Sequence, residues 1–304
     1  MQKLVEATEA LGDAGRLRSM LDRDGYVFLP GLLSRERVAR TRLEVLQGLA
    51  KVGWLRAGEP LDAAAPSAKA IPEGVAPFDV YFEAYAKVQS IQSYHELAHE
   101  PEVLAVMADL FGVPVLAQPM KILRLGVSTP ERWTTPSHQD FPIIDGTVDF
   151  VTAWIPLGDC EPALGGLKIL PGSHRAGRME VLPATGVGAV RVEVDEDDER
   201  FCTAEYEMGD VLIFHSLTVH GALPNTVDRI RVSADFRYQA LTAPLREAML
   251  HPHYGGLIPD WDVLTEGWTS DHSWVTPEGV VIADDNDRAP VTPTLVHLDA
   301  GASA

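Results

Sequence analysis

The spacing of hydrophobic residues predicts helices in the first third of the chain. Leu17 and Leu21 recur at helical spacing, and the short extended run 26–29 that follows them ends at a Pro-Gly pair. Ser34 then stands at the expected N-cap of a helix, directly before a helical pattern over residues 35–50. Residues 57–80 contain Ala, Pro and Gly with little periodicity, which predicts a loop that covers an active site.

From Val113 onward the hydrophobic pattern is that of strands. Short runs rich in Val, Ile and aromatic residues are separated by Gly, Pro, Asn or Asp roughly every ten to twenty residues. These runs include PVLAQPMKILRLG, DFVTAWIPLG, GLKILPGS, RVEV, DVLIFHS and RIRVSADFRYQA. Such punctuation predicts a mainly β fold, an antiparallel sandwich or barrel, rather than alternating strands and helices.

These patterns together predict one domain over residues 1–304. A helical and loop part, residues 1–112, would pack on a β core of residues 113–240, and residues 241–304 would form a C-terminal extension and tail. The extension is irregular and rich in tryptophan, and its last part, residues 284–304, is a polar tail that we expect to be loosely ordered.

Composition narrows the class of partner. Hydrophobic residues make up 46% of the chain, which is enough for a packed core. A net charge of −19, from 44 acidic and 25 basic residues, disfavours nucleic acid and favours a small-molecule substrate. Charges interrupt the N-terminal segment, and no later stretch approaches about 18 uncharged apolar residues, so we expect a cytoplasmic protein without a membrane partner. Cys160 and Cys202 are interpreted as buried small hydrophobic residues, and nothing indicates an oligomeric state.

The stretch SYHELAHEPEVL contains H-E-x-x-H, in which His95 and His99 would bind zinc and Glu96 would act as the catalytic base. However, Pro101 predicts that the helix stops at Glu100, whereas a zinc-binding helix should continue past its second histidine. The segment also reads as an amphipathic helix with both histidines partly solvated. A zinc hydrolase is therefore kept only as a remote alternative.

A stronger set of candidate ligands begins at TTPSHQDF. If this segment is an extended strand, His138 and Asp140 project from the same face. His220 follows in a later strand region, before a Pro-Asn turn that leads to a strand with Arg229 and Arg231. We expect the histidine and the arginines to lie on paired, adjacent strands. Two histidines and a carboxylate form the facial triad of non-haem Fe(II) oxygenases, and an arginine can bind a dicarboxylate through two hydrogen bonds.

In these features the chain resembles the phytanoyl-CoA dioxygenase family of Fe(II)- and 2-oxoglutarate-dependent oxygenases. The resemblance covers about residues 24–240. It is carried by segments of matching order and spacing: DGYVFLPGLL, HELAHEPEVLAVMADLFG, SHQDF, TAWIPLGD, GGLKILPGSH and GDVLIFHSLTVHGALPN. It implies a double-stranded β-helix, the jelly roll or cupin-like barrel, with flanking N-terminal and central helices. The chain departs from the family at residues 163–166, where ALGG replaces the usual Asn-Gly turn, and we expect this to affect a loop only.

The resemblance also implies roles for individual residues. His138, Asp140 and His220 would bind iron, and Arg231, eleven residues past His220, would bind the distal carboxylate of 2-oxoglutarate. Ser233 is a plausible helper of Arg231, which is preferred to Arg229 because of the family spacing. Two further positions, Gln139 and Trp154, would line the co-substrate pocket. Two other histidines are not expected to be ligands: His215 would support the ligands or pack in its strand, and His174 resembles a structural turn histidine.

The resemblance implies that 2-oxoglutarate and dioxygen are consumed, that succinate and CO₂ are released, and that a small molecule is hydroxylated or otherwise oxidised. Related halogenases have a small residue in place of the carboxylate, so Asp140 argues for oxygenation. The alternative is a cupin-like isomerase or hydrolase that keeps the metal ligands without using 2-oxoglutarate. We expect the substrate pocket to be walled by residues 57–80 and 241–283. Because the net charge is −19, a neutral or cationic substrate is predicted.

Overall fold

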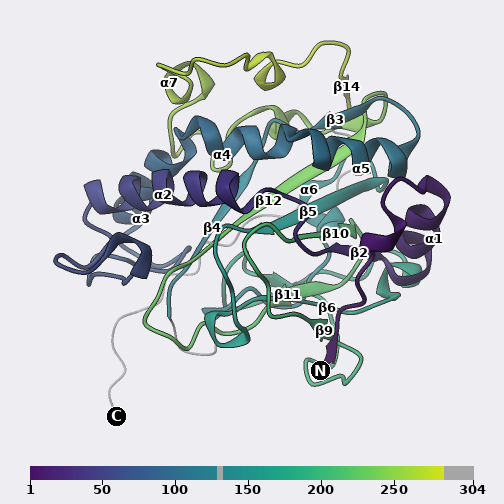
Figure 1. The fold of residues 1–304 in the computed structure, drawn as a ribbon, viewed down its shortest axis with the longest axis horizontal. Coiled ribbons are helices and arrows are strands. Elements are labelled where there is room, and N and C mark those ends of the chain that lie inside the picture. Colours follow the sequence, from purple (N-terminus) through teal and green to yellow (C-terminus); the bar gives the residue numbers. More distant parts are fainter. Residues whose placement is uncertain (129–132, 284–304) are drawn as a thin grey trace.

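The computed structural model of the chain describes residues 1–128 and 133–283 (Figure 1). Its strands form two main sheets. The larger sheet has the order β2-β10-β5-β12-β3, with β4 also paired to β12, and the smaller has the order β1-β9-β6-β11. The two sheets confirm the predicted jelly roll. The strands of the larger sheet are β2 (Tyr26–Leu29), β3 (Val115–Ala117), β4 (Ile122–Gly126), β5 (Phe150–Pro156), β10 (Val211–His215) and β12 (Arg231–Ala240). Those of the smaller sheet are β1 (Gln2–Lys3), β6 (Leu167–Ile169), β9 (Cys202–Thr203) and β11 (His220–Ala222). Two short pairs are β7 (Leu182–Pro183) with β8 (Val190–Arg191), and β13 (Pro244–Leu245) with β14 (Val281–Ile282).

Strand β12 shows how the sequence divides the molecule into an apolar layer and a polar interior. Its side chains alternate strictly, and nearly all are buried. One face carries Val232, Ala234, Phe236 and Tyr238, which join the main hydrophobic core. The other face carries polar residues and points between the two sheets: Arg231, Ser233, Asp235, Arg237 and Gln239. This polar face supplies much of the site.

Helices cover the outer face of the larger sheet, and Figure 1 shows them lying along one side of β12. Their apolar residues pack on the even-numbered side chains of β12, as expected for amphipathic helices on a sheet. These helices are α1 (Ala14–Asp24), α2 (Arg35–Lys51), α3 (Phe78–Gln89), α4 (Gln92–Glu96), α5 (Pro101–Phe111) and α7 (Trp261–Leu264). The short helix α6 (Phe141–Ile144) packs in a separate apolar cluster with Phe150 and Leu245. None of the helices in the described ranges is both long and apolar enough to cross a membrane.

Several local predictions can be compared with these elements. Residues 26–29 form a strand, and Ser34 does occupy the N-cap of α2, although its side chain makes no capping hydrogen bond. The run RVEV was predicted as a strand, but only its first residue belongs to one, β8. Cys160 and Cys202 are buried free thiols. The polar tail, residues 284–304, lies outside the described residues.

Candidate active site

Three predicted ligands meet in the interior between the sheets. His138 and His220 face each other as an isolated antiparallel bridge, with N–H to O=C hydrogen bonds of 2.8 and 3.0 Å in the two directions. Asp140 is not in a strand, contrary to prediction: its backbone is helical and it is the N-cap residue of α6. The chain thus turns directly after the bridge, and this turn places the carboxylate beside both imidazoles.

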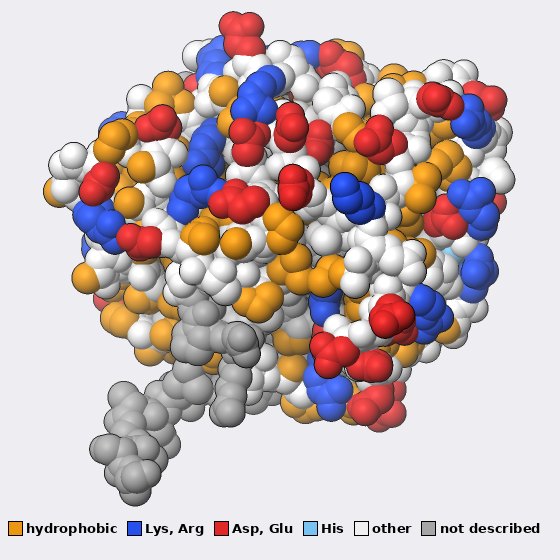
Figure 2. Space-filling view, turned by 60° about the horizontal axis from the view of Figure 1, so that its bottom comes forward, with side chains coloured by type: hydrophobic (Ala, Val, Ile, Leu, Met, Phe, Trp, Pro, Cys, Tyr) orange, Lys and Arg blue, Asp and Glu red, His pale blue; other side chains and the backbone are white. Residues whose placement is uncertain are grey.

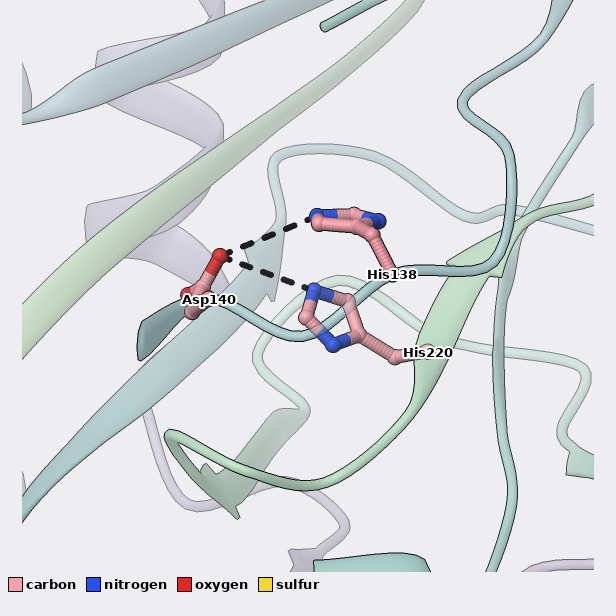
Figure 3. A group of neighbouring side chains, drawn as sticks. All are labelled: His138, Asp140 and His220. Carbon is pink, nitrogen blue, oxygen red and sulfur yellow. Dashed lines mark ion pairs between the residues drawn. The ribbon is translucent and has the colours of Figure 1, made fainter. Parts of the chain in front are cut away.

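The geometry of the three groups suits a single metal ion. Asp140 Oδ1 lies 3.7 Å from His138 Nε2 and 3.8 Å from His220 Nε2 (Figure 3). One ligand atom from each residue lies within 4.8 Å of the others, and all three residues are buried. Each Nδ1 donates to a backbone carbonyl at 2.9 Å, Pro136 O for His138 and Thr218 O for His220. These bonds fix the tautomer that leaves the Nε2 lone pair free for a metal.

Asp140 is held as a charged ligand by a second set of contacts. Its Oδ2 accepts a hydrogen bond of 2.6 Å from Thr152 Oγ1, and Arg237 lies 3.3–3.4 Å from both carboxylate oxygens. Burial would raise the pKa of Asp140, but the Arg237 guanidinium and the two imidazoles outweigh it and hold this pKa well below its usual range. Sequence reasoning missed Arg237, although its place on the polar face of β12 was a usable signal.

The imidazole of His220 is neutral as well as oriented. Burial, followed by the neighbouring His138, lowers the pKa of His220 to about 3. Neutral imidazoles and an ionised carboxylate are the donors that iron(II) takes in oxygenases, so the residues present fit this metal.

Arg231 and Ser233 lie on the polar face of β12. Arg231 lines a small cavity together with the three candidate ligands, Trp154, Leu167 and Phe214. The prediction that His220 and Arg231 lie on paired strands was wrong. Strand β11 belongs to the smaller sheet and β12 to the larger, so the two side chains approach across the interior.

The polar atoms around Arg231 fit a bound carboxylate. Arg231 Nη1 donates to the carbonyl of Gly165, while Arg231 Nε and Ser233 Oγ are buried without a hydrogen-bond partner. Unpaired buried donors are costly, and an anion such as 2-oxoglutarate would satisfy them. The difference from the family at residues 163–166 therefore affects more than a loop, because Gly165 in this segment accepts a hydrogen bond from Arg231, a predicted site residue. A glycine is required there, since its φ is +87° and a Cβ would come within 2.6 Å of Leu223 O.

Of the remaining predicted site residues, Trp154 lines a cavity, whereas Gln139 and Arg229 do not. Trp154 lines the small cavity and also packs edge-on against Tyr206. Gln139 is not brought to either cavity: its amide donates to Gly177 O and Leu217 O and accepts from Met179 N. Arg229, the rival of Arg231, pairs with Glu161 near the surface and lines neither cavity.

His174 and His215 make local contacts. His174 Nε2 bonds to Asp22 O, and His215 Nδ1 accepts from Leu217 N. Neither belongs to the group of converging candidate ligands, as expected for histidines with structural roles.

A larger cavity of about 330 Å³ adjoins the candidate ligands. His138 and Asp140 form part of its wall, and most of the remaining lining is apolar. Both segments predicted as walls contribute to it, residues 73–74 from the loop and residues 246–254 from the C-terminal extension. A third wall, residues 186–190, was not anticipated, because a short segment rich in Gly and Val carries no distinctive signal.

The H-E-x-x-H histidines lie elsewhere and serve packing. Helix α4 ends at Glu96 and α5 begins at Pro101, so the break near Glu100 was predicted correctly. His95 is fully buried, not partly solvated as predicted: its Nε2 lies 2.8 Å from Gln89 O, and its ring packs on three tryptophans of the C-terminal extension. Within the described residues, the only group of three or more candidate metal ligands is that of His138, Asp140 and His220.

Changing His95 to alanine should therefore cost stability and spare the metal. We expect the free energy of unfolding to fall by about 2–4 kcal/mol, because a fully buried ring is removed from a packed cluster. Iron bound per folded protein should not change. Urea unfolding and iron analysis of the folded fraction check this, and loss of iron at unchanged stability would contradict it.

Known proteins resemble this chain in sequence and in fold. Two relatives, each named 1-deoxypentalenic acid 11-beta-hydroxylase, come from Streptomyces arenae and Streptomyces exfoliatus. They are 34% identical over 254 residues and 31% identical over 250 residues, in each case 77% of this chain and 84% of the relative. The solved structure of the epimerase SnoN, in complex with Fe3+, alpha ketoglutarate and nogalamycin RO, superposes with a TM-score of 0.54. It is 24% identical and covers 90% of this chain and 96% of its own, a likeness that shows the fold.

A jelly roll whose interior gathers two histidines and a carboxylate defines the cupin-like class of non-haem iron oxygenases. The sequence model of the family described as phytanoyl-CoA dioxygenase (PhyH) matches residues 21–233. The chain belongs to this family and is a non-haem iron, 2-oxoglutarate-dependent oxygenase.

Proposed function

We propose that His138, Asp140 and His220 bind Fe(II) and that Arg231, assisted by Ser233, binds the distal carboxylate of 2-oxoglutarate. The observation that carries the first assignment is the convergence of two Nε2 atoms and one carboxylate oxygen, with each Nδ1 already bonded to a carbonyl. The second is supported by the unpaired Nε of Arg231, which lines the same cavity as the three ligands, and by the unpaired Oγ of Ser233 on the same face of β12.

The substrate is a largely apolar small molecule that enters the 330 Å³ cavity, and the reaction is its hydroxylation. Iron, 2-oxoglutarate and dioxygen supply the oxidant when bound, with release of succinate and CO₂. The cavity walls hold one substrate carbon near His138 and Asp140 and exclude water from it. Hydroxylation is favoured because both Streptomyces relatives are named as hydroxylases.

The whole chain acts as one oxygenase domain, since the loop of the N-terminal part and the C-terminal extension both wall the cavity. The buried free thiols suit a reducing compartment, in keeping with a cytoplasmic enzyme.

Anaerobic titration tests this function directly. Adding Fe(II) and then 2-oxoglutarate to the protein should produce the visible charge-transfer band of a chelated co-substrate. Admitting oxygen together with an apolar substrate should then release succinate. Iron binding without such a band, or product without succinate, would instead support a cupin-like enzyme that does not use 2-oxoglutarate.

A further inference from the structure

The larger cavity holds three guanidinium groups, and they differ in how their charge is balanced. Arg124 donates to Glu73 at 3.1–3.2 Å and to Asp235 at 3.0 Å, so two carboxylates surround it. Arg237 is paired with Asp140. Arg246 has no carboxylate partner among the residues that the structure describes. Its guanidinium donates a hydrogen bond to a backbone carbonyl, Ile143 O, at 3.2 Å.

Arg246 is also poised to bind. The Arg246 side chain lines the larger cavity, and its Nε is buried without a hydrogen-bond partner. The bond to Ile143 ties the guanidinium to α6, the helix that starts from Asp140. A group bound to Arg246 would therefore sit on the wall that continues from the candidate iron ligands.

The other polar groups of the cavity leave this charge uncompensated. Glu73 is occupied by Arg124 and also accepts the hydroxyl hydrogen of Tyr254. Burial is the main cause that lowers the pKa of His253 well below its usual range, and the positive charges of Arg124 and Arg237 lower it further. His253 is therefore neutral. One positive charge with free donors thus faces a lining that is otherwise apolar or already paired.

We propose that Arg246 binds a carboxylate of the substrate, so that the enzyme acts on apolar organic acids. The planar guanidinium matches a carboxylate through paired hydrogen bonds, and one such monoanion balances the single free charge. The apolar body of the acid would lie on Met120, Ile122 and Met249. This deepens the proposed function, on which it rests, by naming the substrate class.

The inference differs from the neutral or cationic substrate expected from the net charge of −19. On the face shown in Figure 2, Lys and Arg side chains are interspersed with Asp and Glu, so the net charge does not act there as one negative patch. Exposed charges are screened beyond about 8 Å at physiological salt, whereas charges in a cavity act directly on the ligand. The local balance around Arg246 therefore decides which ligand binds.

Binding of a matched pair of probes tests the proposal without catalysis. Adamantane-1-carboxylate and adamantane-1-carboxamide have the same apolar body and differ in charge. Calorimetry on the iron-free protein, and on its anaerobic Fe(II) and 2-oxoglutarate complex, should show the acid binding about 10- to 100-fold more tightly than the amide. The Arg246→Gln variant should lose that preference while its affinity for the amide stays within about twofold.

Two further variants test whether the preference for the acid depends on the Arg246 guanidinium. Arg246→Lys should keep part of the preference, because it keeps the charge but not the fork of donors. Arg56→Gln removes a surface guanidinium paired with Asp228 and should leave both affinities unchanged. Failure of the acid to bind, equal binding of acid and amide, or a preference that survives in Arg246→Gln would overturn the proposal. None of these results depends on succinate release or on the charge-transfer band, so the proposed function is tested separately.

Discussion

Replacing His220 by alanine is expected to remove iron from the protein and to lower turnover by more than about 100-fold, the upper range for loss of a residue that merely supports a ligand. His220 supplies one of two imidazole nitrogens, and its Nδ1 bond to Thr218 O already aims the other nitrogen at the site. The change leaves Asp140 paired with Arg237, so no buried charge loses its partner. Iron stoichiometry, measured after anaerobic loading, and succinate release would report the loss.

His215→Ala is the matched control. This histidine stands five residues earlier at the end of β10 and is partly buried, but it is not among the converging ligands. It should keep both iron and turnover. Stoichiometric iron in the His220 variant, or an equal loss of iron in both variants, would contradict the proposed ligand set.

The candidate ligands could be predicted because they are local features of the chain. His138 and Asp140 are two residues apart, and the turns that flank His220 are visible in the sequence. The sequence did not show how the fold brings these side chains together. Asp140 reaches the site through a helical turn, and His220 and Arg231 approach from different sheets. Alternation within one strand says which residues share a face, but not which strand of another sheet will lie opposite.

Residues that act through contacts distant in sequence were the ones missed. Arg237 lies 97 residues from Asp140, and Arg246 lies 103 residues from Ile143, so no spacing rule connects either pair. His95 was predicted to be partly solvated because helical spacing cannot show that the tryptophans of the C-terminal extension fold over it. The alternation of polar residues along β12 can be recognised in the sequence, but the sequence does not say which of these residues face a ligand.

Replacing Arg231 by glutamine should separate co-substrate binding from iron binding. The guanidinium lines the same cavity as the candidate iron ligands but donates its hydrogen bond to Gly165 O and not to them, so iron affinity should stay within about twofold. Loss of one partner of a buried charged pair costs about 3 kcal/mol, which predicts a rise of roughly 100-fold in the KM for 2-oxoglutarate. Succinate release at varied 2-oxoglutarate concentration, with iron content determined on the same samples, would measure both effects.

The chain offers a close control two residues away. Arg229→Gln makes the same chemical change at a surface ion pair with Glu161, and such exposed pairs contribute at most about 1 kcal/mol. Its KM for 2-oxoglutarate should therefore stay close to that of the unchanged enzyme. If Arg231→Gln lost iron and 2-oxoglutarate binding to the same extent, Arg231 would be a structural arginine, since only damage to the barrel as a whole reaches both sites. An effect on KM that appeared in Arg229→Gln instead would move the co-substrate to the rival position.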